Sequence, residues 1–329
     1  MTLEPSYEGM LHVVKAETDR FDLYRGIAPW LREFEMPLRH VMKEAAVLAP
    51  PADAPEWHAV LVPGLGGARR RAAIERWRRG PAVWQRWADE VRALRAEIAI
   101  DASAERFVAW LTFADFSYQV FPQTVDFRGA DLPAGASFAA AQFLSDAWFS
   151  GSRFGAGADF RGARFSNHAC FEDCWFEGRS DFEDAIFSSS AQFNASIMLC
   201  GLSVRKARFR ADVWLRACQF FGPVDFAEVQ VAGEAGFGNC YFAQDVDFSE
   251  ADFADNVDFE DSLFANQALF EHAAFGRHAR FGRARFEQSP RFRAARFFSI
   301  CHFDDAMIPV MPWPVAEKLE EIEQCFRKL

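Results

Sequence analysis

The sequence lacks the features that mark membrane, secreted and disulfide-bonded chains. No run of eighteen apolar residues occurs in the 329 residues, so we expect no membrane-spanning helix. The first ten residues carry Glu4 and Glu8 and have neither the basic nor the apolar region of a signal peptide, so we expect a cytoplasmic protein. The seven cysteines are scattered, without the spacing of a disulfide framework or a zinc site, and we interpret them as small, reduced core residues.

Catalytic and metal-binding patterns are also missing from the sequence. The seven histidines do not have the spacing of metal ligands. No Ser/His/Asp set and no pair of carboxylates stands out from the polar residues that recur throughout the chain. We therefore expect a protein that is not an enzyme and that holds no cofactor and no metal.

The sequence does contain a repeat, in which a large apolar residue recurs at alternating steps of five and six residues. One series runs in steps of eleven from Phe116 to Phe303, and a second series runs five residues later from Phe121 to Phe297. Together they place 30 of the 37 phenylalanines in 35 positions, so the period is not a chance alignment.

The spacing of this repeat favours strands over helices. Residues five apart on an α-helix lie about 140° from each other, so the two series would not form one apolar stripe. Gly, Asn, Asp and Ser recur within nearly every repeat and would break long helices. An eleven-residue coiled coil is therefore excluded, and short extended segments joined by corners remain.

The position two residues before each large apolar residue is small, as in Ala141 and Ala163. Because side chains alternate along a strand, the small and the large residue of a segment both point inward. Where the large residue shrinks, the small one often grows, as in Leu202 with Val204, Val213 with Leu215, and Val229 with Val231. A close-packed interior of fixed cross-section requires such compensation.

This pattern, as in GADFRGARF (157–165) and EADFADNVDF (250–259), resembles the pentapeptide repeat family over residues 114–303. The resemblance implies a mainly β fold, a right-handed quadrilateral β-helix with four segments per coil and Phe, Leu and Ala stacked inside. The sixth residue in every second segment lengthens each coil to 22 residues, which predicts about 8.5 coils. The WQRW sequence from Trp84 to Trp87 is similar to the Trp-containing leader that precedes many such arrays.

We predict three parts in the chain: a mainly helical leader and cap over residues 1–103, the β-helix over 104–309, and a C-terminal helix over 310–329. Helices are expected in the leader over 8–48, 68–79 and 82–98. At the other end, three prolines after residue 308 stop the array, and the amphipathic residues 315–329 cap its open strand edge.

The leader offers two motifs with two interpretations each. The GLGG sequence at residues 64–67 is either a phosphate-binding loop or a turn before a helix, and its spacing, which matches neither nucleotide fingerprint, favours the turn. The arginines of the following helix either contact nucleic acid or form a solvated or docking face. Residues 1–103 hold 15 basic and 15 acidic groups, which favours the second interpretation. These arginines are Arg69, Arg70, Arg71, Arg76, Arg78 and Arg79.

The residue before each large apolar residue points outward, and positions 22 apart form columns on the surface. One column is an acidic ladder that contains Asp115, Asp159, Asp181, Asp225 and Asp247. Two neighbouring columns carry apolar residues, namely Trp148 and Trp214 in one and Trp175, Ile197, Tyr241 and Leu263 in the next. Clustered exposed aromatic residues mark a contact surface, although isolated ones are ordinary and the leader is an alternative cover for them.

Charge is segmented along the array. Residues 217–276 contain no Lys or Arg and 12 Asp and Glu, whereas residues 277–296 contain seven Arg. This second basic region includes Arg280, Arg283, Arg285 and Arg291.

These observations lead to three functional hypotheses. The first is a non-enzymatic scaffold or adaptor that binds a protein partner or itself through the solenoid surface and the terminal helices. The second follows from the resemblance, because some pentapeptide repeat proteins mimic B-DNA and inhibit or protect type II topoisomerases; the acidic ladder favours it, and the arginine-rich last coils and the large leader disfavour it. The third is nucleic-acid binding through the helix from Arg69 to Arg79 or the arginine-rich last coils, which would show as salt-sensitive retention of DNA.

Overall fold

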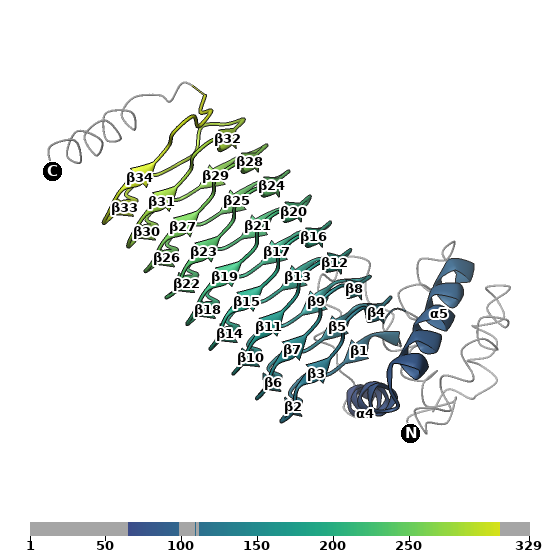
Figure 1. Cartoon of the computed structure of the whole chain (residues 1–329). Coiled ribbons are helices and arrows are strands. Elements are labelled where there is room, and N and C mark those ends of the chain that lie inside the picture. Colours follow the sequence, from purple (N-terminus) through teal and green to yellow (C-terminus); the bar gives the residue numbers. More distant parts are fainter. Residues whose placement is uncertain (1–64, 99–108, 110–111, 310–329) are drawn as a thin grey trace, which may run out of the picture. The chain divides into compact units, whose positions relative to one another are not determined.

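The computed structural model describes residues 65–98, 109 and 112–309 (Figure 1). The chain divides into two compact units, Met1–Asp115 and Phe116–Leu329. The predicted division into residues 1–103, 104–309 and 310–329 stays a prediction, and the helices expected over 8–48 and 315–329 lie outside the described residues.

Two helices are described in the first unit, α4 (Leu65–Arg78) and α5 (Pro81–Ile98). They agree with the predictions for 68–79 and 82–98 to within three residues at each end. Gly80, with φ 97°, separates them in the left-handed conformation that ends helices, and its N–H bonds the Trp77 carbonyl at 3.0 Å. The next residue, a proline, suits the first position of α5 because it has no N–H to leave unpaired. One face of α5 is buried through Trp84, Trp87, Ala88 and Val91.

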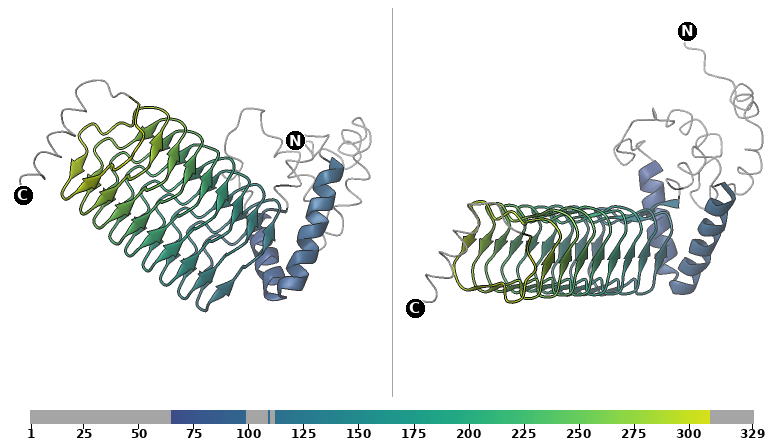
Figure 2. Two further views of the ribbon diagram at one scale, coloured as in Figure 1. Left: turned by 45° about the horizontal axis from the view of Figure 1, so that its top comes forward. Right: turned by 90° about the horizontal axis from the view of Figure 1, so that it is seen from above.

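Two-residue strands between Ala114 and His302 form four parallel sheets, and each coil as far as β32 gives one strand to each sheet (Figures 1 and 2). Sheet I contains β1 (Ala114–Asp115), β5 (Ala136–Ser137), β9 (Ala158–Asp159), β13 (Ser180–Asp181), β17 (Leu202–Ser203), β21 (Val224–Asp225), β25 (Val246–Asp247) and β29 (Ala268–Leu269). Sheet II contains β2 (Val120–Phe121), β6 (Gln142–Phe143), β10 (Arg164–Phe165), β14 (Ile186–Phe187), β18 (Arg208–Phe209), β22 (Gln230–Val231), β26 (Asp252–Phe253), β30 (Ala274–Phe275) and β33 (Arg296–Phe297).

The two remaining sheets complete each coil. Sheet III contains β3 (Val125–Asp126), β7 (Ala147–Trp148), β11 (Ala169–Cys170), β15 (Ala191–Gln192), β19 (Val213–Trp214), β23 (Ala235–Gly236), β27 (Val257–Asp258), β31 (Ala279–Arg280) and β34 (Cys301–His302). Sheet IV contains β4 (Asp131–Leu132), β8 (Arg153–Phe154), β12 (Trp175–Phe176), β16 (Ile197–Met198), β20 (Gln219–Phe220), β24 (Tyr241–Phe242), β28 (Leu263–Phe264) and β32 (Arg285–Phe286).

Every strand pairs with the strand one coil away, and the paired residues are 22 positions apart, as the spacing predicts. Arg164 of β10, for example, pairs with Gln142 and with Ile186. A mainly-β solenoid of the right-handed type, with about nine coils, is thereby confirmed. Its quadrilateral cross-section and the capping helix at the C-terminus stay predictions.

The core of the solenoid is a set of stacked rings. Phe138, Phe160 and Phe182 of successive coils stack face to face with centroids 4.8 and 4.7 Å apart. Between sheets the rings meet edge to face, as Phe149 does with Phe160 at 5.5 Å and 88°. Both geometries suit the quadrupole of an aromatic ring. The aliphatic residues that interrupt the ladder are buried with their enlarged neighbours in the three pairs expected from the sequence, Leu202 with Val204, Val213 with Leu215, and Val229 with Val231.

The corners that lead into sheets II and IV share one turn geometry. In the corner before β18, the N–H of Ala207 bonds the Val204 carbonyl at 3.0 Å, and Lys206 between them has φ 57°. A left-handed residue at this place is the signature of a type II turn. The turn directs the next small residue, here Ala207, into the core.

Candidate interaction surfaces

The outward side of sheet IV carries an uninterrupted uncharged area. Its strands place one outward residue per coil in a column, and successive members pair in register: Arg153, Trp175, Ile197, Gln219, Tyr241, Leu263 and Arg285. The sequence-predicted residues Trp175, Ile197, Tyr241 and Leu263 therefore lie in one column.

A second outward column, which sequence reasoning missed, follows the inward large residue of each strand. Its N–H groups bond carbonyls of the preceding coil, as Leu199 does with Phe176 at 2.9 Å and Phe221 with Met198 at 2.9 Å. The column contains Glu177, Leu199, Phe221, Ala243, Ala265 and Glu287. The sequence did contain the signal for this column, because the residue directly after each inward large residue also recurs every 22 positions.

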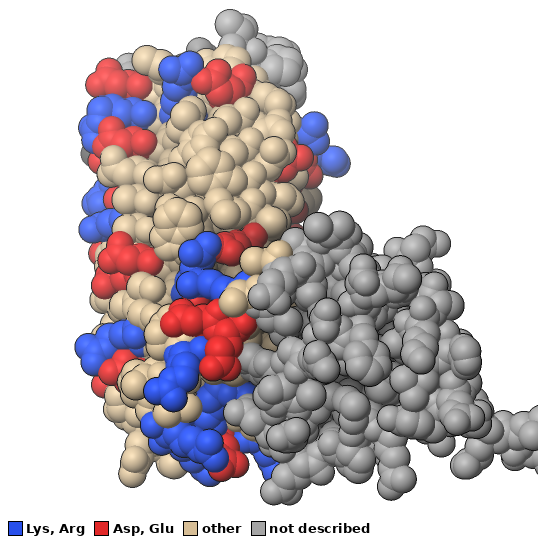
Figure 3. All heavy atoms as spheres, turned by 90° about the vertical axis from the view of Figure 1, so that its right-hand side faces the viewer, with Lys and Arg blue, Asp and Glu red and all other residues tan. Residues whose placement is uncertain are grey.

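Four coils of these two columns contain no charged residue, and we call them the uncharged patch: Ile197, Leu199, Gln219, Phe221, Tyr241, Ala243, Leu263 and Ala265. Leu199 and Phe221 are 39% and 41% exposed, and the flanking Trp175 is 47% exposed. The Phe221 and Tyr241 rings meet edge to face at 5.8 Å. Figure 3, which looks onto the side of Figure 1 where β4 to β32 lie, shows a broad area without charge between charged groups.

Ion pairs close both ends of the patch. Arg153 pairs with Glu177 at the end nearer β8. Arg285 pairs with Glu287 at 2.7 Å at the end nearer β32. Each end of the patch thus presents one guanidinium and one carboxylate, both partly exposed to solvent.

The predicted residues Trp148 and Trp214 lie on sheet III and are partly buried against their own neighbours. The Arg216 guanidinium lies 4.5 Å from the centroid of the Trp214 ring. The ring also lies against Gly236, where an added Cβ would come within 2.5 Å of the indole and 3.2 Å of the Arg216 Nε. Trp148 packs against the His168 ring at 5.3 Å. The six residues therefore lie on two neighbouring sheets, as the two predicted columns require, and their role as a partner surface stays a prediction.

The acidic ladder lies on sheet I, and its carboxylates hold the corners of the fold. Register places Asp159 beside Asp181 and Asp225 beside Asp247. Each of these four carboxylates accepts the backbone N–H two residues later, at 2.8 to 3.1 Å. Burial raises the pKa of Asp181, although the N–H of Glu183 opposes that shift. The fifth predicted member, Asp115, is buried 3.7 Å from Arg70.

Arginines reduce the negative charge of this ladder. Arg161 pairs with Asp159 at 3.0 Å and lies 4.0 Å from Asp181. Arg205 pairs with Glu228 and lies 4.0 Å from Asp225. The column is thus a mixed-charge surface over these coils.

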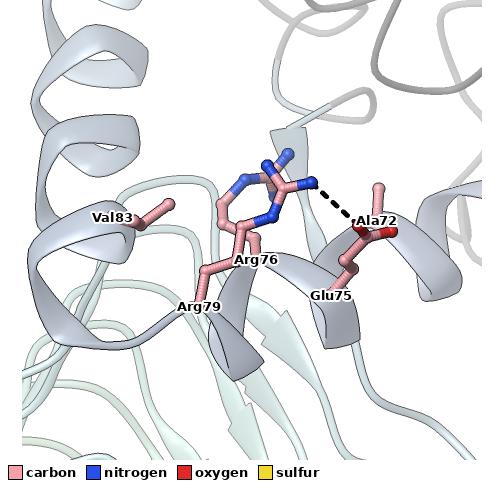
Figure 4. Close-up of a pocket in the computed structure, with 5 residues that line it drawn as sticks. All are labelled: Ala72, Glu75, Arg76, Arg79 and Val83. Carbon is pink, nitrogen blue, oxygen red and sulfur yellow. Dashed lines mark hydrogen bonds and ion pairs between the residues drawn. The ribbon is translucent and has the colours of Figure 1, made fainter.

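The predicted basic residues do not form one patch. In α4, Arg76 is buried with its guanidinium 4.4 Å from the Trp87 ring, whereas Arg71 and Arg78 are exposed. Arg79 pairs with Glu75 at 2.8 Å at the edge of a small pocket that Ala72, Arg76 and Val83 also line (Figure 4). The backbone of Arg69 lies in α4.

The arginines of the last coils lie on different sheets. Arg280 is on sheet III and Arg285 on sheet IV, and Arg291 forms an isolated bridge with Leu269 of sheet I. Arg283 sits at a corner with φ 54° and pairs with Asp261 at 2.6 Å. Hydrogen bonding to Asp261 raises the pKa of the Arg283 guanidinium, and the same bond lowers the pKa of the Asp261 carboxyl.

Buried hydroxyls and thiols form a column inside sheet IV, which sequence reasoning treated only as small filler. The hydroxyl of Ser196 donates to the Phe171 carbonyl at 2.6 Å and accepts the Cys174 N–H at 2.9 Å. The Cys174 thiol donates to the Phe149 carbonyl at 3.0 Å. The same bond to a carbonyl 25 residues earlier is made by Ser152, Cys218, Cys240 and Ser262.

Two thiols of this interior, Cys174 and Cys240, are held in the protonated form by burial. Burial raises the pKa of Cys174 and of Cys240 well above its ordinary range. The described cysteines form no disulfide, and Cys200 is the exposed one among them. Within residues 65–98 and 112–309, no group of three or more His, Cys, Asp and Glu side chains is arranged to hold a metal ion. The two described helices are too short or too polar to cross a membrane.

Parallel two-residue strands, a 22-residue register and a stacked phenylalanine core define the class of protein as a β-solenoid. The family model described as pentapeptide repeats (9 copies) matches residues 116–164. The chain therefore contains pentapeptide repeats over these residues, and the 22-residue strand register continues in the structure well beyond them, to β34. No curated protein and no solved structure matches the chain.

Proposed function

We propose that this protein is a non-enzymatic scaffold that binds a protein through the uncharged patch of sheet IV. The observation that carries the proposal is the run of four coils without charge in both outward columns, with Leu199 and Phe221 exposed. Pentapeptide repeat solenoids commonly serve as scaffolds for protein interactions.

The energetic argument rests on apolar area. Exposed apolar surface that leaves water contributes about 25 cal/mol per Å² to association. Aromatic and large aliphatic side chains at the centre of an area, with charges around it, are the usual anatomy of a protein interface. Parallel strands with stacked cores also keep the patch rigid, so little conformational entropy is lost when a partner binds.

The test compares two matched pairs of exposed residues. Leu199→Asp with Phe221→Asp places charge in the patch, whereas Leu144→Asp with Phe298→Asp places it on sheet II, where these residues are 50% and 65% exposed at the same position after the inward large residue. Proteins captured by each variant from the native source are compared by quantitative mass spectrometry. We expect a protein, or a second copy of this chain, that only the sheet IV variant fails to bind. Identical capture by both variants contradicts the proposal.

A second candidate function is DNA mimicry directed at a type II topoisomerase. It is supported by the register of the acidic ladder and by residues 217–276, which contain 12 acidic and no basic groups. The corner hydrogen bonds and the ion pairs with Arg161 and Arg205 weigh against it, because a mimic needs continuous negative potential. A supercoiling assay with purified gyrase decides, and no effect at micromolar protein rejects this function.

A third candidate is nucleic-acid binding through the arginine clusters. The separation of Arg280, Arg283, Arg285 and Arg291 over different faces weighs against it. Salt-sensitive retention of the protein on immobilised DNA would favour it.

A further inference from the structure

We propose that residues 310–329 of this chain fold back along sheet IV and occupy the uncharged patch, in competition with a protein partner. The inference rests on the proposed function and adds a means of regulating the same site. It is supported by the place where the described chain leaves the solenoid, and by the length and the apolar pattern of the residues that follow.

The described chain leaves the solenoid on sheet IV. Met307 forms an isolated parallel bridge with Arg285. Pro309 follows Glu287 by 22 positions and so belongs to the second outward column. Glu287 donates its N–H to the Phe264 carbonyl at 2.9 Å, whereas a proline has no N–H to donate. The ladder of sheet IV therefore ends at Met307, and the chain leaves it in line with the second column of the patch.

Residues 315–329 carry apolar side chains at the spacing of one helix face. Separated by four, three, four and three residues, these side chains are Val315, Leu319, Ile322, Phe326 and Leu329. The helix expected from the sequence is roughly 22 Å long, because each residue adds about 1.5 Å. The four coils of the patch span roughly 19 Å at about 4.8 Å per coil. The apolar face of the segment and the patch therefore have nearly the same length.

The patch is uneven along its length. In the half nearer Pro309, the second column consists of the small residues Ala243 and Ala265. In the other half it consists of Leu199 and Phe221. A helix that follows this column from Pro309 therefore finds a hollow for its first apolar side chains. Filling the hollow gives closer packing than a flat partner surface would.

The open end of the solenoid offers less room for the same residues. Packed sheets lie about 10 Å apart, so a helix of roughly 22 Å would extend well beyond the end of the core. Part of the apolar face of residues 315–329 would then stay in water. Sheet IV can cover all of this face, which favours the patch over the cap at the strand edge.

Charge along the segment makes its binding reversible. The three glutamates between residues 320 and 323 lie above the coils of residues 217–276, which hold 12 acidic and no basic groups. Their repulsion opposes binding and is weakened by salt. At the far end of the patch, Arg327 and Lys328 reach the coil of residues 172–184, whose six acidic groups and one basic group attract them. Opposed contributions of this kind suit an occupant that a partner can displace.

Disulfide trapping tests where the segment lies. Cys325 stands at the edge of the apolar face. With the first turn of the helix at the coil of Arg285, Cys325 comes level with Gln219, roughly 15 Å further along the stack. In a background with Cys200 and Cys301 replaced by serine, Gln219→Cys should form an intramolecular disulfide with Cys325 on mild oxidation. Peptide mass spectrometry without reduction detects the link.

Two matched variants serve as controls in the same background. Gln230→Cys lies at the corresponding outward position of sheet II, and Ser299→Cys lies in the last coil at the open end. Neither should link with Cys325 in comparable yield. A higher yield for Ser299→Cys would place the segment over the open end, and equal yields in all three variants would show that it has no fixed place. Either result overturns the inference.

Alkylation tests whether the apolar face holds the segment on the patch. Leu319→Asp with Phe326→Asp places charge in that face, whereas Ala316→Asp with Gln324→Asp places it on the other side of the same helix. With Gln219→Cys as the reporter and the other accessible thiols replaced by serine, N-ethylmaleimide should react several-fold faster in the first variant than in the second. Equal rates overturn the inference. Circular dichroism confirms that every variant is folded.

The two proposals fail in different ways. If the segment and a partner compete for the patch, Leu319→Asp with Phe326→Asp should capture more of that partner than wild type does. Trapping at Gln219→Cys without any captured protein that depends on Leu199 and Phe221 rejects the scaffold and supports the occupied patch. Capture that depends on Leu199 and Phe221, in a chain without trapping at Gln219→Cys, rejects the occupied patch and supports the scaffold.

Discussion

Sheets II and IV have the same backbone turns and the same stacked inward rings, but they differ in their small inward residues and in their outward side chains. Each follows a type II corner, and each stacks one large inward residue per coil, so their backbones and ladders are equivalent. Inside, the small position of sheet II is almost always alanine, whereas sheet IV has serine and cysteine that bond backbone carbonyls. Outside, charged residues such as Arg164, Arg208 and Asp252 recur on sheet II, whereas sheet IV has four uncharged coils. The comparison shows that a solenoid can vary each face independently while the ladder stays constant.

The largest expected effect tests the equivalence of the two ladders. Phe165 in sheet II and Phe264 in sheet IV each stack on two rings, at 4.6 to 4.9 Å. Replacing either with alanine should cost about 3–5 kcal/mol of unfolding free energy, because it removes a buried ring and leaves a cavity. Urea unfolding measures both, and costs that differ by more than about 2 kcal/mol would show that the two ladders are not equivalent.

The next largest effect should come from the buried serine of sheet IV, which has alanine at the matching position in sheet II. Ser196→Ala removes a hydroxyl that is inserted between the Phe171 carbonyl and the Cys174 N–H, so both groups lose a buried partner. We expect a loss of about 1–3 kcal/mol in the same measurement. The matched change in sheet II, Ala207→Ser, adds a buried hydroxyl at a corner whose N–H already bonds the Val204 carbonyl. If Ser196→Ala leaves the unfolding free energy unchanged, the serine only occupies space in the core and its hydrogen bonds do not stabilise the fold.

Alkaline pH should affect sheet IV through its thiols. Burial raises the pKa of Cys174 and Cys240 above the ordinary value of 9.0, so the folded chain keeps these protons when the unfolded chain releases them. Their contribution to stability is therefore complete below that value and is lost as the pH rises above it. Unfolding free energy measured on either side of pH 9 should fall less in Cys174→Ser with Cys240→Ser than in wild type. If unfolding free energy falls equally with pH in both proteins, the thiols are not the cause of the alkaline loss of stability.

The smallest effect should be the same for both sheets. Ala140 before sheet II and Ala217 before sheet IV have φ 53° and 57°, which strains a residue with a Cβ. Glycine avoids that strain and loses more entropy on folding, so each replacement should stabilise by only a few tenths of a kcal/mol. Thermal unfolding of the two variants measures this, and shifts of opposite sign would show that the corners differ.

Most of the fold followed from the sequence, because the core repeats with a strict period. The spacing of phenylalanines predicted the 22-residue register, and the enlarged residues at Leu202 and Val213 predicted where the ladder would change. The helices α4 and α5 were also predicted, to within three residues at each end.

The surfaces were harder to predict, because side-chain contacts decide them. Leu199 and Phe221 were missed since only the residue before each large apolar position was treated as outward. Trp214 was assigned to the same surface as Trp175, but its exposure depends on its contacts with Arg216 and with Gly236 of the next coil. The role of Ser196 depends on two backbone groups in the preceding coil, which spacing alone does not reveal.

The core and the surface of this chain repeat with different periods, and this limits how the solenoid can lengthen by duplication. The buried ladder repeats every eleven residues, whereas each face repeats only every 22. A duplication of eleven residues would preserve the core and still fold, but every downstream residue would move half a turn around the solenoid, and a patch such as that on sheet IV would be divided between sheets II and IV. Evolution can therefore lengthen the molecule and keep its surfaces only by gaining or losing whole coils.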